Sequence, residues 1–162
     1  MGRNFIVCFA GYLVASNVWA QLADNRTIIG AGNEFLSAGS FAIRTGQYDE
    51  GIRLTHLGLT RYQPNQSDRV AALSNLCAAH AAKGEPDVAI PFCDESLSMS
   101  TRNWRAYSNR AYAYFLKGML SEATFDLESA AAISPEARQV TQLRGMFNEV
   151  GLRPRVIVED HL

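Results

Sequence analysis

Small and bulky residues alternate along this chain with the spacing of an α-helical face. Positions four and seven residues apart lie on one side of a helix. Runs with this spacing are separated by short connections that contain Gly46, Gly84 and Gly118. The pattern predicts helices over the ranges 32–44, 48–61, 67–82, 86–99, 103–116, 120–132 and 135–149. We therefore expect an all-α fold.

The same pattern recurs along the chain. Gly84 and Gly118 are 34 residues apart, and Gly46 precedes Gly84 by 38 residues. Small residues stand at three fixed distances from these glycines. Seven residues before them are Gly39, Cys77 and Ala111, five residues after them are Gly51, Ala89 and Ala123, and twelve residues after them are Gly58, Ser96 and Ala130. Small side chains let two antiparallel helices approach closely, and a glycine can end the first helix in a conformation that a side chain would resist. Each unit is predicted to be a helix-turn-helix hairpin.

This repeat resembles the tetratricopeptide repeat (TPR) family. The third unit matches the family's signature spacing most fully, at Trp104, Tyr107, Ala111, Tyr114, Gly118, Ala123 and Pro135. The resemblance implies a right-handed superhelical stack of three units, at residues 32–65, 70–103 and 104–135. A capping helix at 136–150 is expected to cover the last hairpin, because the final apolar face of a stack needs a cover. Its core side would be Ala137, Val140, Leu143 and Phe147.

Both ends of the chain are expected to lie outside the repeats. Residues 1–20 are predicted to be a signal peptide, with positive Arg3, an apolar stretch at 5–15 and small residues before a cleavage site after Ala20. An uncleaved anchor helix is the alternative, although the apolar stretch is short for a bilayer. Cleavage would leave an extended lead-in at 21–31 and no membrane insertion, and residues 151–162 would form a tail.

Composition bears on location and on the class of partner. Thirteen arginines against two lysines favour a bacterial source, so an exported bacterial TPR protein is expected, in the periplasm or otherwise secreted. The net charge is −1, with 15 basic and 16 acidic residues and no run of like charges. A nucleic-acid binder needs a basic face, so no nucleic-acid partner is expected.

The motifs of most catalytic and metal sites are absent from the sequence. It contains no P-loop, HExxH or CxxC motif, and His56, His80 and His161 fall in different units or in the tail. Stacked hairpins seldom bring a nucleophile together with a histidine and an acid. We therefore predict a non-enzymatic protein- or peptide-binding scaffold without metal or other cofactor. The alternatives are a self-associating structural component of an envelope assembly and a small secreted hydrolase or metal-dependent enzyme.

The first helices of the hairpins are expected to line a concave groove that binds a peptide. Tyr112 and Phe115 are predicted to anchor it, because core packing should not need both rings. Asn75 and Asn109 would bond either an extended peptide or neighbouring helices. Some TPR domains clamp a C-terminal carboxylate with Lys, Asn, Asn, Lys and Arg, and of the matching positions only Asn75 and Arg105 fit. The complete clamp is therefore not expected.

Cys77 and Cys93 are predicted to form a disulfide. Cys77 lies seven residues before Gly84 and Cys93 nine residues after it, so both sit at nearly the same height on facing helices. Cys77 occupies a small position where the short Cα separation of a disulfide can be met. Export favours this bond over two buried free thiols. The spacing is not CxxC, so the expected role is structural and not catalytic.

Overall fold

The protein is described by a computed structural model, which covers residues 33–149 and in that range contains seven α-helices and no strand. They are α1 (Glu34–Arg44), α2 (Tyr48–Arg61), α3 (Gln66–Ala82), α4 (Pro86–Met99), α5 (Trp104–Leu116), α6 (Leu120–Ile133) and α7 (Arg138–Glu149). The predicted all-α fold is confirmed. The expected signal peptide, lead-in and tail lie outside the described residues.

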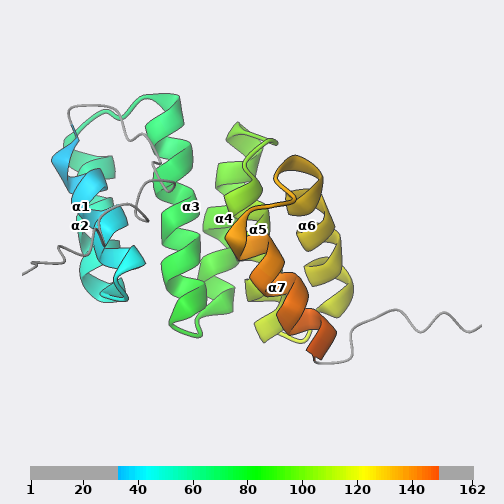
Figure 1. Cartoon of the computed structure of the whole chain (residues 1–162). Coiled ribbons are helices and arrows are strands. Elements are labelled where there is room, and N and C mark those ends of the chain that lie inside the picture. The colour runs from blue at the N-terminus through cyan, green and yellow to red at the C-terminus, as the bar shows by residue number, and fades with distance from the viewer. Residues whose placement is uncertain (1–32, 150–162) are drawn as a thin grey trace, which may run out of the picture.

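The helices form a curved stack of hairpins (Figure 1). Within residues 33–149, the backbone of α1 packs near α3, that of α3 near α5 and that of α5 near α7, whereas the backbones of α2, α4 and α6 stay further apart and α2 meets α4 through the side chains of His56 and Phe92. A stack whose helices pack more closely along one layer than along the other curves toward the closer layer. The helices α1, α3, α5 and α7 therefore form the concave side of the superhelix, and α2, α4 and α6 form its outer side.

The three hairpin turns share one geometry. Gly46, Gly84 and Gly118 have φ angles of 81°, 77° and 72°, a region that residues with a side chain enter only at a cost. After each glycine a backbone N–H donates back to a carbonyl of the preceding helix, as from Glu85 to His80 at 2.9 Å. This bond satisfies a carbonyl that would otherwise be free. The prediction that these glycines end the first helices is confirmed.

An asparagine begins the first helix of every hairpin. The side-chain oxygens of Asn33, Asn65 and Asn103 each accept a hydrogen bond from the backbone N–H three residues further on. Such a cap pairs one of the free donors at a helix start and contributes about 1 kcal/mol. The start of each concave-side helix is therefore fixed locally, in the same way in all three units.

The last helix begins later than predicted. Residues 134–137 form a reverse turn instead of a first helical turn, and the N–H of Ala137 donates to the carbonyl of Ser134 at 3.2 Å. The chain needs this turn because α6 continues to Ile133 and α7 must then fold back against the hairpin. The expected covering role of α7 is confirmed, because it buries Val140, Leu143 and Phe147.

Small residues bring the paired helices into close contact, as predicted. In the second and third units, Cys77, Ala89, Ala111 and Ala123 are 0% exposed. In the first unit, a Cβ added to Gly39 would lie 2.5 Å from Oγ1 of Thr55 on the facing helix. The separation of α1 and α2 therefore depends on glycine at this position.

Candidate functional site

A pocket of about 190 Å³ lies on the concave side between α3 and α5. Its lining residues come from the first half of α3, the connection after α4 and the start of α5: Ser67, Val70, Ala71, Ser74, Asn75, Ser100, Asn103 and Arg105. The structure thus brings together Asn75 and Arg105, two of the predicted groove residues that belong to different units. We call this site the concave pocket.

Arg105 supplies the positive charge of the concave pocket. The side chain is half-buried, and its guanidinium carbon lies 4.3 Å from the centre of the Trp104 ring. Among residues 33–149 it has no acidic partner. Burial lowers the pKa of Arg105, but an arginine in a protein keeps its proton. A half-buried cation without a counter-ion can accept an acidic group from a ligand.

Neutral donors surround this arginine. The side-chain amide of Asn75 and the hydroxyls of Ser67 and Ser100 have no hydrogen-bond partner within the described range. Asn103, by contrast, is held in place, because it caps α5 and donates to Oγ of Ser96 at 2.9 Å. The concave pocket therefore combines one cation with several free donors, which suits a carboxylate or an extended peptide backbone.

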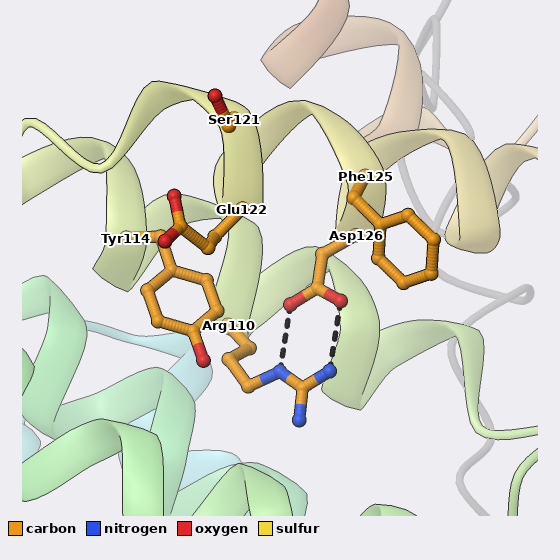
Figure 2. A pocket seen from close by; sticks show the side chains of 6 residues that line it. All are labelled: Arg110, Tyr114, Ser121, Glu122, Phe125 and Asp126. Atoms are coloured by element: carbon orange, nitrogen blue, oxygen red, sulfur yellow. Dashed lines mark hydrogen bonds and ion pairs between the residues drawn. The ribbon is translucent and has the colours of Figure 1, made fainter.

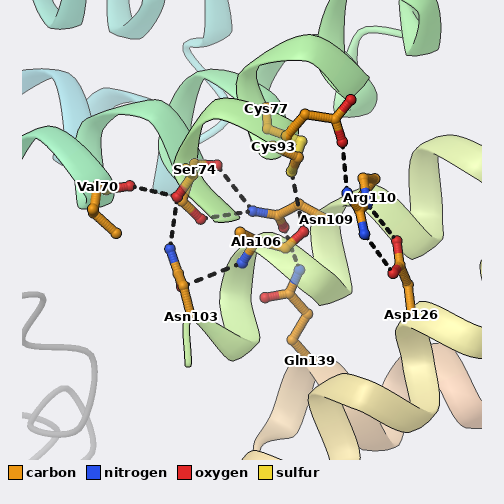
Figure 3. Close-up of a disulfide and its surroundings, with 12 residues drawn as sticks. Val70, Ser74, Cys77, Cys93, Asn103, Ala106, Asn109, Arg110, Asp126 and Gln139 are labelled. Carbon is orange, nitrogen blue, oxygen red and sulfur yellow. Dashed lines mark hydrogen bonds and ion pairs between the residues drawn. A yellow bond between two sulfur atoms is a disulfide. The ribbon is translucent and has the colours of Figure 1, made fainter. Parts of the chain in front are cut away.

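Asn109 is part of the packing between helices. It is 6% exposed, its Nδ2 donates to the carbonyl of Ser74 at 2.9 Å, and its Oδ1 accepts from Nε2 of Gln139 at 2.5 Å (Figure 3). These bonds join α3, α5 and α7. Of the two interpretations left open for Asn109, the structure favours the bonding of neighbouring helices, and its amide is not available to a peptide.

Tyr112 and Phe115 are also used in packing. The Phe115 ring stacks on Phe147 of α7, with the ring centres 5.1 Å apart and the planes at 18°. Tyr112 packs against the buried side chains of both the second and the third unit. Core packing was expected not to need both rings, but the structure packs both of them, because α7 covers this end of the stack. Contact of these rings with a peptide stays a prediction. Neither residue lines the concave pocket.

Cys77 and Cys93 form a disulfide in the structure, with their Cα atoms 5.4 Å apart (Figure 3). Both residues are 0% exposed. The bond joins α3 to α4, and Cys77 stands two positions after Asn75 on the helix that forms one wall of the concave pocket. Its burial keeps other thiols away from the sulfur atoms, which fits a structural bond.

The described residues offer no metal site. Between residues 33 and 149, no three His, Cys, Asp or Glu side chains gather closely enough to hold a metal ion. His80 stacks on Phe92, with ring centres 5.5 Å apart, and its Nδ1 lies 2.7 Å from a Glu85 oxygen. Hydrogen bonds from His80 and Lys83 lower the pKa of Glu85.

None of the helices between residues 33 and 149 is both long and apolar enough to span a bilayer.

Several solved structures share this arrangement of hairpins. The first TPR of Spaghetti (RPAP3), bound to the HSP90 peptide SRMEEVD, has a TM-score of 0.59 and 24% identity, covering 72% of this chain and 90% of that chain. The OM64 TPR domain from Arabidopsis has a TM-score of 0.61 and 16% identity, covering 72% and 93%. The Hsp90 co-chaperone Cns1 from Saccharomyces cerevisiae has a TM-score of 0.63 and 18% identity, covering 73% and 38%. The chain has the TPR fold.

Sequence comparison gives a partial match. No family model matches the chain. The FK506-binding protein-like protein of Homo sapiens is 30% identical over 114 residues, which is 70% of this chain. The chain spans 32% of the length of that relative.

Ser67 and Ser100 of the concave pocket were missed from the sequence. The predicted groove residues lie on the first helices of the hairpins, whereas Ser100 lies in the connection between two TPR units. Ser67 lies in the first turn of α3, well before Asn75, the groove residue predicted on that helix. Both residues are polar and lie at the boundary between two adjacent TPR units, and this combination could have identified them from the sequence.

Proposed function

We propose that this protein is a non-enzymatic scaffold that binds an acidic peptide segment of a partner protein in the concave pocket. The observation that carries the proposal is Arg105, a half-buried cation without an acidic partner in the described range, beside the free amide of Asn75. A guanidinium can hold a carboxylate through two parallel hydrogen bonds. The amide of Asn75 can bond the backbone of the same segment.

The peptide in one structural neighbour supports this chemistry. The first TPR of Spaghetti (RPAP3) is bound to SRMEEVD, a peptide with three acidic residues. The present chain retains Asn75 and Arg105 of the clamp positions, whereas Leu36 and Ser40 stand at two others and Asn109 is used in packing. We therefore propose that one carboxylate is held by Arg105 and Asn75, without the complete clamp.

We also propose that the protein works outside the cytoplasm, in the cell envelope or periplasm. The pairing of Cys77 with Cys93 supports this location, because structural disulfides persist in oxidising compartments. The charged and apolar start of the sequence supports it too. Fractionation of source cells tests the location: the protein should be released with the envelope fraction, and its recovery with cytoplasmic markers would contradict it.

Peptide binding tests the function. The full chain is titrated into fluorescently labelled SRMEEVD, and the dissociation constant is measured by fluorescence anisotropy. Arg105→Ala should weaken binding about tenfold, because it removes a charge-assisted pair, and Asn75→Ala should weaken it less. Arg102→Ala is the matched control, since Arg102 is exposed and does not line the pocket. Equal affinity of the Arg105→Ala and wild-type proteins would overturn the proposal.

A further inference from the structure

A second pocket, of about 280 Å³, lies away from the concave side. It is lined by Arg110 and Tyr114 of α5 and by Ser121, Glu122, Phe125 and Asp126 of α6 (Figure 2). Arg110 forms ion pairs with Asp94 of α4 and with Asp126 of α6. The pocket therefore lies toward the gap between two outer helices, and we call it the outer pocket.

Arg110, the one basic residue that lines the outer pocket, is already paired with acidic side chains. Nε and Nη2 of Arg110 donate to the two carboxylate oxygens of Asp126 at 2.7 and 2.8 Å, and Nη1 donates to Asp94 at 2.6 Å. The hydrogen bonds to Asp126 raise the pKa of Arg110. Three acidic side chains surround this one base: Asp94, Glu122 and Asp126. Three negative charges and one positive charge leave a local charge of −2. An anionic ligand would be repelled.

The side chains of Glu122 and Phe125 and the hydroxyl of Tyr114 remain free for a ligand in the outer pocket. Glu122 is exposed and forms no ion pair within the described part of the chain. Phe125 is 70% exposed, more than any other large apolar side chain among residues 33–149. Burial raises the pKa of Tyr114, so its hydroxyl stays neutral, and this hydroxyl has no hydrogen-bond partner in the same range. Figure 2 shows Tyr114 and Phe125 on opposite sides of the Arg110–Asp126 pair.

We propose that the outer pocket binds an arginine or lysine side chain from a basic segment of a partner protein. The ring of Phe125 attracts a cation and covers its apolar stem, whereas the ring of Tyr114 already faces Arg110, whose guanidinium carbon lies 5.8 Å from the ring centre. Glu122 supplies the counter-charge, and the Tyr114 hydroxyl can accept a hydrogen bond from the same cation. This site is distinct from the concave pocket, which has the opposite charge preference.

Two matched peptides test this site on the full chain. The probe is an acetylated and amidated peptide that alternates glycine with arginine, and its control carries neutral citrulline in place of every arginine. The arginine peptide should bind, its affinity should fall as salt rises, and the citrulline peptide should bind much more weakly. Glu122→Gln and Phe125→Ala should each weaken binding of the arginine peptide about fivefold.

Control variants separate the outer pocket from general surface effects. Glu136→Gln and Phe41→Ala remove an exposed acid and an exposed ring outside the outer pocket and should leave binding unchanged. Arg105→Ala should also leave it unchanged, so this test does not depend on the concave pocket. Circular dichroism checks that each variant folds. The proposal is overturned if the citrulline peptide binds as tightly, or if Glu122→Gln and Phe125→Ala bind the arginine peptide like the wild type.

Discussion

Arg105 and Arg110 stand five positions apart on one helix, but their surroundings give them different roles. Arg110 is held by Asp126, which is 1% exposed, and by the more exposed Asp94. Arg105 has no such partner within the described range, although it too is partly buried. Removal of one member of a buried ion pair leaves the other charge unpaired in a poorly solvated place. The first arginine is therefore available to a ligand, and the second stabilises the fold.

Asp126→Asn should lower the free energy of unfolding by about 3 kcal/mol, because it breaks the bidentate pair with Arg110. The matched control is Asp94→Asn, at a side chain that is 52% exposed. It should cost less than about 1 kcal/mol, as exposed ion pairs do. Urea unfolding at neutral pH, followed by circular dichroism, measures both. Equal losses for the two variants would contradict the assignment of Asp126 as the structural partner.

The Cys77–Cys93 bond should be present in protein isolated from its own compartment. Mass spectrometry of the unreduced protein should find a crosslinked peptide pair that lacks the two thiol hydrogens. The cysteines are 16 positions apart, and closure of such a loop stabilises the folded state by roughly 3 kcal/mol in the chain-entropy estimate. Reduction should therefore shift urea unfolding to lower concentration. Two thiols that alkylate freely without a reductant would refute the bond.

Most helix boundaries follow from local chemistry, and the exception shows where such chemistry is ambiguous. The glycine turns and the asparagine caps act within a few residues, so the sequence was sufficient to place α2 and α4 at 48–61 and 86–99. The start of α7 was misplaced, because proline suits both the first turn of a helix and the second position of a reverse turn. Only the packing of α7 on the last hairpin decides between them.

Two glycine substitutions separate helix propensity from close packing. Gly145→Ala in α7 should stabilise the protein by about 1 kcal/mol, because a Cβ there meets nothing within 4 Å and alanine favours the helix. Gly39→Ala should destabilise it by about 1–3 kcal/mol, because the new Cβ would lie 2.5 Å from Thr55 Oγ1 and 3.0 Å from the Gly51 carbonyl oxygen. Thermal unfolding gives both values. Shifts of the same sign in the two variants would contradict this description of the α1–α2 contact.

For the molecule as a whole, the repeat pattern was enough to predict the stack and part of its concave site. It placed Asn75 and Arg105 on adjacent concave-side helices, and the structure brings them to one pocket. It did not predict that both Tyr112 and Phe115 take part in packing, because the position of α7 against them depends on the folded end of the stack. The outer pocket could not be predicted, since it depends on how Arg110 bridges α4 and α6.

The two pockets give the molecule two chemically different faces. The concave pocket presents the cation of Arg105 with neutral donors, whereas the outer pocket presents excess negative charge with exposed aromatic surface. Electrostatic complementarity selects partners and their orientation. The arrangement suits a scaffold that holds an acidic segment on one face and a basic segment on the other.

Nuclear magnetic resonance of the isotope-labelled full chain, titrated with SRMEEVD, locates the bound peptide directly. The backbone amide signals of residues near Asn75 and Arg105 should shift most, with smaller changes at Ser67 and Ser100, because these residues line the concave pocket. The same titration of the Arg105→Ala variant should give much smaller shifts. No shift in the wild type, or shifts confined to α2, α4 and α6, would contradict peptide binding on the concave side.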